Sequence, residues 1–458
     1  MNRTVRRAGA FALVGSLVLV VPVVGRAAVA IPAVVLAFTA AVQEGPLFDV
    51  FARPGDREDG RLYGLIGFTL AATGLGILWV IAALPLAVFV GTVLLVAWGN
   101  ATSVTVKQRY PNPFAASAGF AAGGSVAFAA GAAFATLREA GGVADVSDAL
   151  PELAFLAVAG AVMGALVRAA LFEHDDPLVL WSVALTLWFL GDLVTDPVPG
   201  EVALAVGVTV AFGYVSYALE TASVPGMLTG VLLGLLTIVL GGLEWFAVLI
   251  AFYAIGGLST KFEYERKAER GVAEDNEGAR GSGNVLGNSA VALAAVVGYA
   301  AVDAGYVPLA QEVYLYAFVG SLSTAMSDTL SSEIGAVYDD PRLVTTFERV
   351  EPGTDGAITW QGELAGFFGA VLVAGVAFAL FPAVDAAGAG VVFAAGVVGM
   401  TADSVLGATI EDAFLGNQGV NFLATLVGAL VGGGLAVVAL DVALSAALLA
   451  PDVALAVT

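Results

Sequence analysis

Apolar residues fill most of this chain in continuous runs, and charged residues collect in the segments between them. About 20 apolar residues in a helix cross roughly 30 Å of hydrocarbon, and the runs predict about fifteen membrane-spanning helices. We therefore expect an all-α, polytopic membrane protein. The runs cover residues 8–25, 27–42, 63–81, 82–98, 114–136, 151–171, 178–195, 201–219, 225–241, 243–260, 285–302, 307–327, 362–382, 387–409 and 419–449. The last run is long enough for a helical hairpin.

The composition supports a membrane protein and argues against some classes of partner and metal site. Hydrophobic residues make up 59% and charged residues 12% of the chain, whereas soluble proteins have about 25% charged residues. The net charge of −21 argues against nucleic acid as a partner, because phosphate backbones are bound by Lys and Arg. Segments such as 56–59 and 173–176 predict an acidic surface, typical of adaptation to a high-salt cytoplasm. The absence of cysteine excludes thiolate sites, and a single histidine makes zinc unexpected.

The distribution of basic residues predicts an orientation. A cytoplasmic N-terminus places every Lys and Arg except Arg26 and Arg138 on the cytoplasmic side. Segments 261–284 and 328–361 then form the two long cytoplasmic segments of the second half. We therefore expect a multi-pass protein of the cell membrane whose active site faces the cytoplasm.

Polar chemistry is concentrated after residue 224. Residues 1–224 have short loops and predict an N-terminal transmembrane helical region, while residues 225–458 predict a catalytic transmembrane domain. A faint internal similarity links Gly99 to Gly124 with Ser327 to Gly366. It leaves open that the N-terminal region is a degenerate repeat that serves as scaffold.

Two carboxylates stand at the ends of apolar runs, each beside hydroxyl side chains. Asp328 follows Ser327, and Asp403 precedes Ser404. A carboxylate at membrane depth costs several kcal/mol unless it is paired, hydrated or bound to a cation. We predict that Asp328 and Asp403 meet in one polar chamber built from several helices. Mg²⁺, which takes one or two carboxylates together with substrate phosphates, is the expected cofactor.

Glu333 is the third acid that we expect at the active site. On a continuous helix it points about 140° away from Asp328. Either Glu333 serves a different task, or the helix ends near Ser332 and both acids turn toward one site. A capped helix end at the interface would explain the Ser and Asp residues but not Glu333. We predict Asp328, Glu333 and Asp403 as catalytic residues and metal ligands.

The segment 259–271 is the most basic one in an acidic chain. Its residues Lys261, Arg266 and Lys267 either end a membrane helix and set its orientation, or bind phosphate groups. We predict that these three cations bind the nucleotide or the lipid phosphate.

A Gly-rich turn containing Arg280 follows, directly before a helix whose N-terminus can bind phosphate. Asn284 and Asn288 share one face of that helix, where they either bind a ligand or make interhelical hydrogen bonds. We predict a role in phosphate binding for all three residues.

Two later segments complete the predicted binding site. The turn Gly353-Thr354-Asp355-Gly356 is either an anion-binding loop or a plain surface turn. Asn417, Asn421 and Thr425 form a polar stripe that faces either a ligand or a neighbouring helix. From these segments, and from the site around Asp403, we predict as nucleotide- or phosphate-binding residues Thr354, Asp355, Gly356, Ser404 and Asn421.

In this order, the segments resemble the transmembrane family of the phytyl-phosphate kinases of tocopherol synthesis and their uncharacterised relatives, over about residues 225–450. The matching motifs are the basic loop with Lys261, Arg266 and Lys267, Val285-Leu286-Gly287-Asn288, Asp328-Thr329 with Ser332-Glu333 and Gly335, Pro341-Arg342 with Thr345-Thr346, Gly353 to Gly356, Asp403-Ser404 with Gly407-Ala408, and Val420-Asn421-Phe422. The resemblance adds Arg342 to the predicted phosphate-binding residues. The chain departs from the family at Asn284, where Gln is usual, and at Arg280, where a pair of arginines is usual.

The resemblance implies a kinase embedded in membrane lipids. Similar enzymes transfer the γ-phosphoryl group of a nucleoside triphosphate, typically CTP, to a prenyl monophosphate such as phytyl or geranylgeranyl phosphate. Catalysis of this kind is mostly positioning and charge neutralisation, with Mg²⁺ between two polyanions. One alternative is a CTP-dependent cytidylyltransferase that acts on a lipid phosphate. Another is a membrane transporter, which predicts intramembrane charges in both halves of the chain. The scarcity of such charges before residue 224 argues against the transporter.

Overall fold

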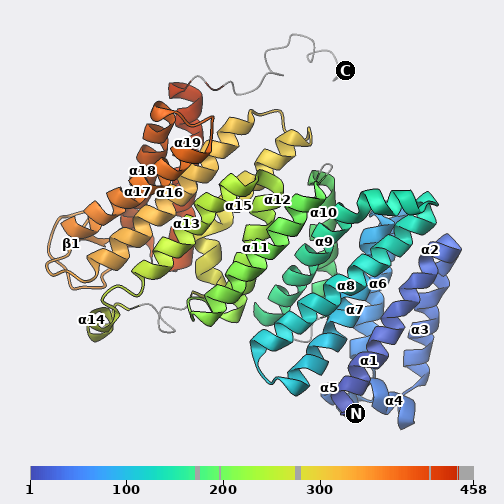
Figure 1. Ribbon diagram of the computed structural model, residues 1–458. Coiled ribbons are helices and arrows are strands. Elements are labelled where there is room, and N and C mark those ends of the chain that lie inside the picture. The colour runs from blue at the N-terminus through green and yellow to red at the C-terminus, as the bar shows by residue number, and fades with distance from the viewer. Residues whose placement is uncertain are drawn as a thin grey trace. The chain divides into compact units, whose positions relative to one another are not determined.

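The computed structural model describes residues 2–170, 176–194, 197–273, 280–411, 414–440 and 442. These residues form helices joined by short connections, with one small antiparallel hairpin among them (Figure 1). The predicted all-α fold is therefore confirmed. The chain divides into two compact units, Met1–Val208 and Thr209–Thr458. We predicted that residues 1–224 form an N-terminal transmembrane helical region and residues 225–458 a catalytic domain. This functional division stays a prediction.

Unit 1 begins with several short helices and continues with long ones. Its elements are α1 (Arg3–Gly15), η1 (Ser16–Val20), α2 (Val21–Val24), η2 (Gly25–Val29), α3 (Ala30–Ala41), α4 (Gly45–Phe51), α5 (Pro54–Asp59), α6 (Tyr63–Ile81), α7 (Leu86–Arg109), α8 (Pro113–Ala140), α9 (Val143–Ala170) and α10 (Asp176–Leu193). The next helix, α11 (Pro199–Ala218), crosses from unit 1 into unit 2.

Unit 2 contains seven long helices after α11 among the residues described. They are α12 (Val224–Gly241), α13 (Leu243–Ser259), α15 (Ser282–Asp303), α16 (Gln311–Gly335), α17 (Trp360–Leu380), α18 (Ala386–Ile410) and α19 (Asn417–Ala439). The short helix α14 (Tyr264–Glu269) follows α13. The strands β1 (Arg342–Leu343) and β2 (Ala357–Ile358) pair between α16 and α17, with Arg342 opposite Ile358.

Each of the fifteen predicted apolar runs overlaps a helix. Within the described part of the chain, twelve helices are long and apolar enough to cross a membrane, and the bent pair α3–α4 would make a thirteenth. The other two runs correspond to α13 and α16. Helix α13 is short, at 17 residues, and α16 is too polar to count as a candidate membrane span. The second half of the run 419–449, where a hairpin was predicted, extends beyond the described residues.

Helix α16 is polar because it is surrounded by protein. It packs against α13, α15, α17, α18 and α19. Its buried hydroxyls include Thr324, whose Oγ1 atom donates to the carbonyl oxygens of Gly320 (3.1 Å) and of Ala395 on α18 (3.2 Å). Small residues let membrane helices approach closely, and Gly428 of α19 lies against Gly320 and Thr324. The centre of unit 2 can therefore carry polar side chains without exposing them to lipid.

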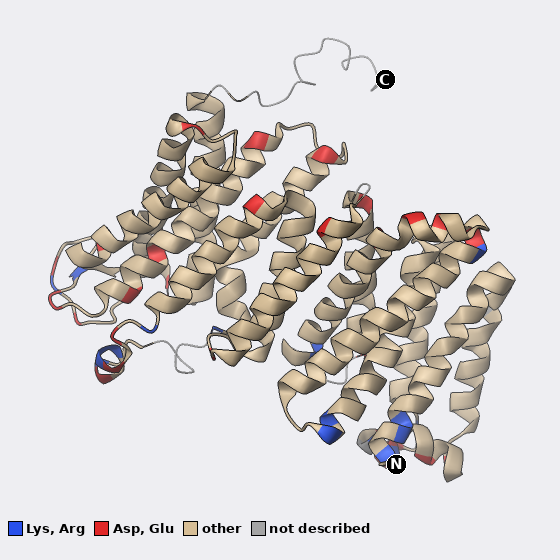
Figure 2. Ribbon diagram, in the orientation of Figure 1, with Lys and Arg blue, Asp and Glu red and all other residues tan. Residues whose placement is uncertain are grey.

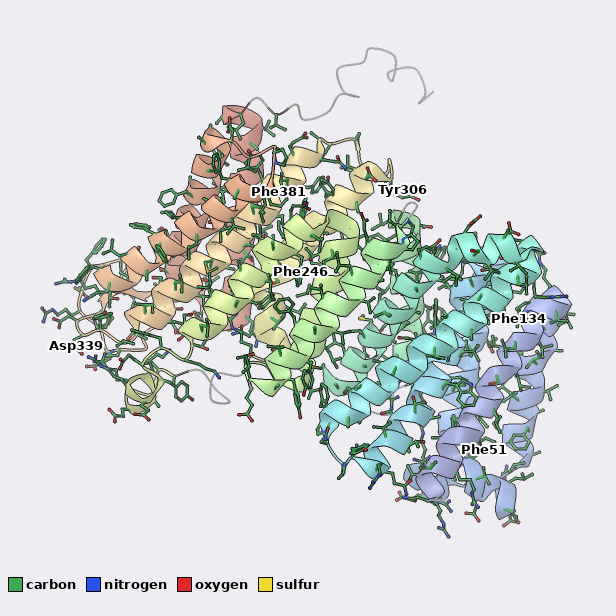
Figure 3. All side chains as sticks on the ribbon, in the orientation of Figure 1. Phe51, Phe134, Phe246, Tyr306, Asp339 and Phe381 are labelled. Carbon is green, nitrogen blue, oxygen red and sulfur yellow. The ribbon has the colours of Figure 1, made fainter. Side chains whose placement is uncertain are left out.

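Aromatic side chains fix the N-terminal end of α13. The ring of Trp245 lies 4.7 Å from that of Tyr299, 4.6 Å from that of Phe318 and 5.9 Å from that of Phe381, which is labelled in Figure 3. Such tilted and edge-on contacts add to the hydrophobic burial of large rings. They hold α13 against α15 and α16.

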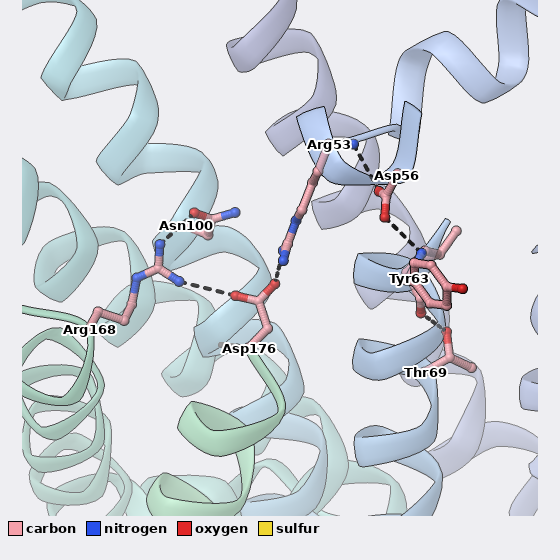
Figure 4. A network of polar contacts seen from close by, with 8 residues as sticks. Arg53, Asp56, Tyr63, Thr69, Asn100, Arg168 and Asp176 are labelled. Atoms are coloured by element: carbon pink, nitrogen blue, oxygen red, sulfur yellow. Dashed lines mark hydrogen bonds and ion pairs between the residues drawn. The ribbon is translucent and has the colours of Figure 1, made fainter. Parts of the chain in front are cut away.

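A buried ion network ties several elements of unit 1 together (Figure 4). Asp176, at the start of α10, accepts from Arg53 Nη2 (2.5 Å) and from Arg168 Nη1 (3.1 Å), and Arg168 also donates to Asn100 Oδ1 (3.0 Å). Asp56 accepts from the backbone N–H groups of Arg53 (2.8 Å) and Tyr63 (2.9 Å).

The network corrects one prediction from the sequence. Segments 56–59 and 173–176 were expected to be acidic surface, yet Asp56 and Asp176 are only 4% and 3% exposed. Burial is possible because each carboxylate accepts several hydrogen bonds from neighbouring elements. Glu58 and Asp59 are exposed as expected, and residues 173–175 lie outside the described residues.

Basic residues are unevenly placed within unit 1. Figure 2 shows most of its Lys and Arg residues at the end of the helices that holds the N-terminus of the chain, and few at the opposite end. This separation is the pattern on which the predicted orientation rests. The cytoplasmic placement of the N-terminus stays a prediction.

Candidate active site

Two acids from different helices meet in unit 2. The carboxyl groups of Asp328 on α16 and Asp403 on α18 lie within hydrogen-bonding reach of each other. Both helices are long and rigid, and their contact near Gly399 and Thr324 is close because Gly399 has no side chain. Two carboxylates at this distance repel each other unless a proton or a cation lies between them. The pair is therefore the centre of the candidate site.

A chain of amides extends from the acid pair. The side-chain nitrogen of Asn421 on α19 lies 3.3 Å from Asp403 Oδ1 and 3.1 Å from Asn417 Oδ1, and its oxygen lies 3.2 Å from Asn288 Nδ2 on α15. This orientation of the Asn421 amide is the one that gives every atom a suitable partner. Asn288 Nδ2 also donates to the Asn284 carbonyl oxygen at 3.0 Å. Four helices thus contribute polar groups to one chamber.

Glycines bring α15 and α19 close enough for these contacts. A β-carbon at Gly287 would lie 2.9 Å from the backbone oxygen of Gln418, and Gly283 lies against the Gln418 side chain. Larger residues at these two positions would push the helices apart and separate Asn288 from Asn421. Gly287 belongs to the matched motif, and the packing explains why a small residue is needed there.

Some buried polar atoms beside the chamber lack partners. Asn284 Oδ1, Ser323 Oγ and Ser327 Oγ are buried and accept or donate no hydrogen bond to any described residue. Buried polar atoms are almost always hydrogen-bonded, to protein or to bound water and ligands. Ser327 directly precedes Asp328, and Asn284 lies one turn before Asn288. These atoms therefore leave unused hydrogen-bonding capacity in and beside the chamber.

Glu333 does not join the acid pair. Its carboxylate binds Lys267 Nζ on α14, and Lys267 also donates to the carbonyl oxygen of Thr260 (2.8 Å). Lys267 is 1% and Glu333 is 9% exposed. Helix α16 continues to Gly335, so Glu333 points away from Asp328 as helix geometry requires. The sequence left two options open for Glu333. The structure agrees with the first, in which Glu333 serves a different task from that of Asp328.

Arg280 lies against α13. It is 8% exposed, and its guanidinium carbon lies 5.4 Å from the centre of the Phe252 ring. A β-carbon at Gly256 would be 3.0 Å from Arg280 Nη2 and 3.4 Å from Thr329 Cγ2. The cation and the Thr329 side chain therefore lie beside the same glycine. Its backbone is fixed by pairing with Thr221 and Ser223.

The predicted glycine turn lies against α18. Gly356 has φ of +71°, which favours glycine, and a β-carbon there would collide with the Ser404 carbonyl oxygen and with Ala408. The structure thus brings Gly356 next to Ser404, beside Asp403. Thr354 and Asp355 are exposed at the tip of the turn.

Three predicted cations stand apart from the chamber on exposed segments. Arg342 donates to the Phe347 carbonyl oxygen (2.7 Å), and Lys261 donates to the Leu219 carbonyl oxygen (3.1 Å). Arg266 is exposed on α14. Among the described residues, none of these cations forms an ion pair with Asp328 or Asp403, and their predicted contact with phosphate stays a prediction.

Two side-chain contacts, one in the chamber and one near it, were not predicted from the sequence. Asn417 contacts Asn421. The spacing of four residues between them in the polar stripe was a sequence signal for this contact. The Tyr253 hydroxyl on α13 lies 2.6 Å from Ser289 Oγ, next to Asn288. A tyrosine in an apolar run carries no signal of such a contact in the sequence.

The electrostatics and the donor set of the chamber fit a divalent cation. Glu333, Glu363 and Glu411 all add to the negative field at Asp328. No third carboxylate or histidine joins the pair to form a metal cluster within the described ranges. Mg²⁺ commonly takes only one or two carboxylates and completes its shell with water and substrate phosphates. The oxygen atoms of Asp328 and Asp403 therefore fit Mg²⁺, while the Asn421 side-chain nitrogen faces Asp403 Oδ1.

Comparison with known proteins identifies the segment that carries this site. Residues 207–429 match the family described as Integral membrane protein DUF92. An uncharacterized membrane protein of Methanocaldococcus jannaschii is 34% identical over 213 residues, which are 45% of this chain and 82% of that protein. The chain belongs to the DUF92 integral membrane family.

Two more relatives agree with this assignment to DUF92. Protein VTE6, chloroplastic, of Arabidopsis thaliana is 33% identical over 220 residues, 46% of this chain and 63% of that protein. An uncharacterized membrane protein of Synechocystis is 33% identical over 206 residues, 42% of this chain and 75% of that protein. These matches confirm the resemblance predicted for residues 225–450. No solved structure matches the chain.

The DUF92 segment contains the whole chamber. All predicted site residues, from Lys261 to Asn421, lie within residues 207–429, and nearly all of unit 1 lies before them. The segment that matches the DUF92 family therefore lies almost entirely in unit 2.

Proposed function

We propose that unit 2 is a CTP-dependent kinase that converts a prenyl monophosphate, such as phytyl or geranylgeranyl phosphate, to the diphosphate. The observation that carries the proposal is the pairing of Asp328 with Asp403. The buried cation Arg280 lies beside Gly256, as does Thr329, the residue after Asp328. An acid pair that binds a metal ion and a cation that binds phosphate are the two groups that phosphoryl transfer requires. The motif resemblance and the 33% identity to Protein VTE6, chloroplastic, support a prenyl-phosphate kinase of this kind.

The proposed reaction needs little covalent chemistry from the protein. An oxygen of the lipid phosphate attacks the γ-phosphorus of CTP, the bond between that phosphorus and the bridging β-oxygen breaks, and CDP leaves. The attacking oxygen is already ionised, so no general base is required. The side chains have to hold two polyanions together and neutralise their charge.

Each part of the chamber has a role in this proposal. Arg280 binds the lipid phosphate, while Asp328 and Asp403 would hold Mg²⁺, which would supply positive charge to the phosphoryl groups. The amide of Asn421 orients Asp403 and is itself held by Asn288. The Gly356 turn, seated on Ser404, binds the nucleotide phosphates. The Lys267–Glu333 ion pair fixes α14 and the end of α13 beside the site.

The test is direct. Purified protein is incubated with radiolabelled CTP, Mg²⁺ and a C20 prenyl monophosphate, and the lipid products are separated. We expect a prenyl diphosphate and CDP. If no diphosphate forms with CTP or any other nucleoside triphosphate, the proposal is wrong.

The released nucleotide product decides between two kinds of transfer. A cytidylyltransferase would attack the α-phosphorus and release pyrophosphate in place of CDP. Pyrophosphate as the product would therefore replace the kinase with that alternative.

We also propose that the site faces the cytoplasm of a cell-membrane protein. CTP is a cytoplasmic metabolite, and the long segment 328–361 lies on the same side as the N-terminus in the arrangement that the basic residues favour.

A further inference from the structure

An apolar cavity of about 300 Å³ lies in unit 2, between α11, α12 and α13. Its walls are formed by large apolar side chains from all three helices, including Phe212, Met227, Val231, Phe246 and Leu249 (Phe246 is labelled in Figure 3). Ligand cavities of a few hundred Å³ with apolar walls and a small number of polar groups are typical binding sites. The candidate active site described above does not account for this cavity.

One end of the cavity carries a cation. Arg280 is one of the lining residues, together with Tyr253. The Tyr253 hydroxyl is already engaged by Ser289 (2.6 Å), so that Arg280 supplies the charge at this end. The Arg280 guanidinium lies beside Gly256 on α13, and the Thr329 side chain lies beside the same glycine. The cavity therefore ends at a buried arginine that lies next to the glycine facing Thr329, the residue after Asp328.

We propose that this cavity binds the isoprenoid chain of a prenyl monophosphate, with the phosphate on Arg280. The shape of the ligand follows from the site: a long hydrocarbon without polar groups, ending in an anion. The prenyl phosphate of the proposed kinase reaction has this chemistry, and the inference rests on that proposed function for the fate of the phosphate. Chain binding itself requires no nucleotide and no turnover.

Two glycines make the cavity open to a precise test. Gly230 on α12 and Gly257 on α13 both line it, and no atom lies within 4 Å of the place where a β-carbon would stand on either residue. A larger side chain at these positions would therefore enter the cavity without displacing the protein. Replacing glycine in a helix by leucine also favours the helix itself. Gly375 on α17 is equally open but does not line this cavity, so Gly375→Leu is a matched control.

The experiment measures binding by the full-length protein in detergent. Thermal unfolding is followed with increasing geranylgeranyl (C20) monophosphate, geranyl (C10) monophosphate or dioleoyl phosphatidic acid, in the absence of nucleotide. A ligand that binds only the folded state raises the unfolding temperature, and the rise grows with the logarithm of its concentration relative to Kd. We expect Gly230→Leu to weaken C20 binding at least about tenfold while changing C10 binding less than about threefold. Gly257→Leu should act in the same direction, and Gly375→Leu should leave both affinities unchanged.

Arg280→Gln separates the head of the ligand from its chain. It should weaken the binding of both prenyl phosphates by the same factor, at least about tenfold, because it removes the charge and leaves the cavity open. The proposal is overturned if Gly230→Leu binds C20 and C10 ligands as the wild type does, or if Gly375→Leu loses C20 binding equally. It is also overturned if phosphatidic acid binds as tightly as the C20 monophosphate.

Failure of the cavity proposal can be told apart from failure of the kinase proposal. If the protein binds C20 phosphate in a chain-length-dependent way but makes no diphosphate, the cavity proposal stands and the kinase proposal is wrong. If the protein makes diphosphate but Gly230→Leu leaves the chain preference unchanged, the kinase proposal stands and the cavity proposal is wrong.

Discussion

Lys267 on α14 binds the carboxylate of Glu333 on α16, and both side chains are almost fully buried. The same ammonium group donates to the carbonyl oxygen of Thr260 at the end of α13. Three elements therefore meet at one ion pair beside the candidate site. A cation and an acid that each resembled a ligand-binding residue in the sequence satisfy each other in the structure.

Removing one partner of this pair should destabilise the protein. Lys267→Met leaves Glu333 buried without a counter-charge, and such a change costs about 3–5 kcal/mol. Glu333→Gln should be destabilising in the same way, whereas the double variant Lys267→Met/Glu333→Gln should recover much of the loss because neither charge remains. Chemical unfolding of the four proteins in detergent measures this coupling.

Arg266→Met is the matched control, because Arg266 is exposed on the same helix. It should change the free energy of unfolding by less than about 0.5 kcal/mol. Equal effects of Lys267→Met and Arg266→Met would show that the ion pair contributes nothing to the fold.

The Asn421 amide should control the geometry of Asp403. It lies between Asp403 Oδ1 and Asn288 Nδ2, so Asn421→Ala removes a contact on each side. We expect kcat to fall about tenfold, a loss of about 1.4 kcal/mol in transition-state stabilisation, and the Mg²⁺ concentration for half-maximal activity to rise. Thr409→Ala on the exposed face of α18 removes a hydroxyl that binds only its own helix, and should leave both quantities unchanged. Equal Mg²⁺ requirements in wild type and Asn421→Ala would contradict the positioning role.

Sequence patterns predicted the helices and the acid pair well because both depend on local rules. Each apolar run had to form a helix in a membrane, and each acid stood at the end of such a run beside hydroxyls. That Asp328 and Asp403 would meet followed from the cost of leaving either acid alone among lipid. The polarity of α16 followed the same rule, since only a helix enclosed by others tolerates so many hydroxyls.

Pairings between distant segments could not be predicted in the same way. Nothing near Lys267 in the sequence indicates Glu333 as its partner, and nothing near Asp176 indicates Arg53 and Arg168. Both acids were assigned by the character of their own segments, Glu333 as a metal ligand and Asp176 as an acidic surface residue. Their true partners depend on which helices pack together, which periodicity does not determine.

The Asp176 network predicts a stability effect confined to unit 1. Asp176→Asn leaves Arg53 and Arg168 without the carboxylate that both bind. We expect the free energy of unfolding to fall by about 3 kcal/mol. This is the low end for a broken buried ion pair, because the Arg53 side chain is 20% exposed. Thermal unfolding and the yield of inserted protein measure the loss. Kinase activity per folded molecule should stay unchanged; a selective loss of activity without destabilisation would mean that the network serves catalysis.

The orientation can be tested with single cysteines, since the chain has none of its own. Glu351→Cys, in the segment between α16 and α17, should be protected in intact cells from a membrane-impermeant maleimide and labelled after the cells are opened. Glu139→Cys, at the end of α8 next to Arg138, should be labelled in intact cells. Both residues are exposed, so accessibility within the fold does not differ. The reverse labelling pattern would invert the predicted topology and place the site outside the cytoplasm.

Asp328 is the residue on which the proposed chemistry depends most. Asp328→Asn keeps the size and hydrogen-bonding capacity of the side chain and removes the charge that holds Mg²⁺ with Asp403. We expect a folded, membrane-inserted protein whose activity falls at least about a hundredfold, a transition-state loss of about 2.7 kcal/mol. Asp59→Asn is the control, because Asp59 is exposed on α5 and lies before the DUF92 segment. It should change activity little. Prenyl diphosphate formation at saturating CTP and Mg²⁺ compares the two variants. If both retain the same activity, Asp328 only caps the polar end of α16, and the acid pair is structural.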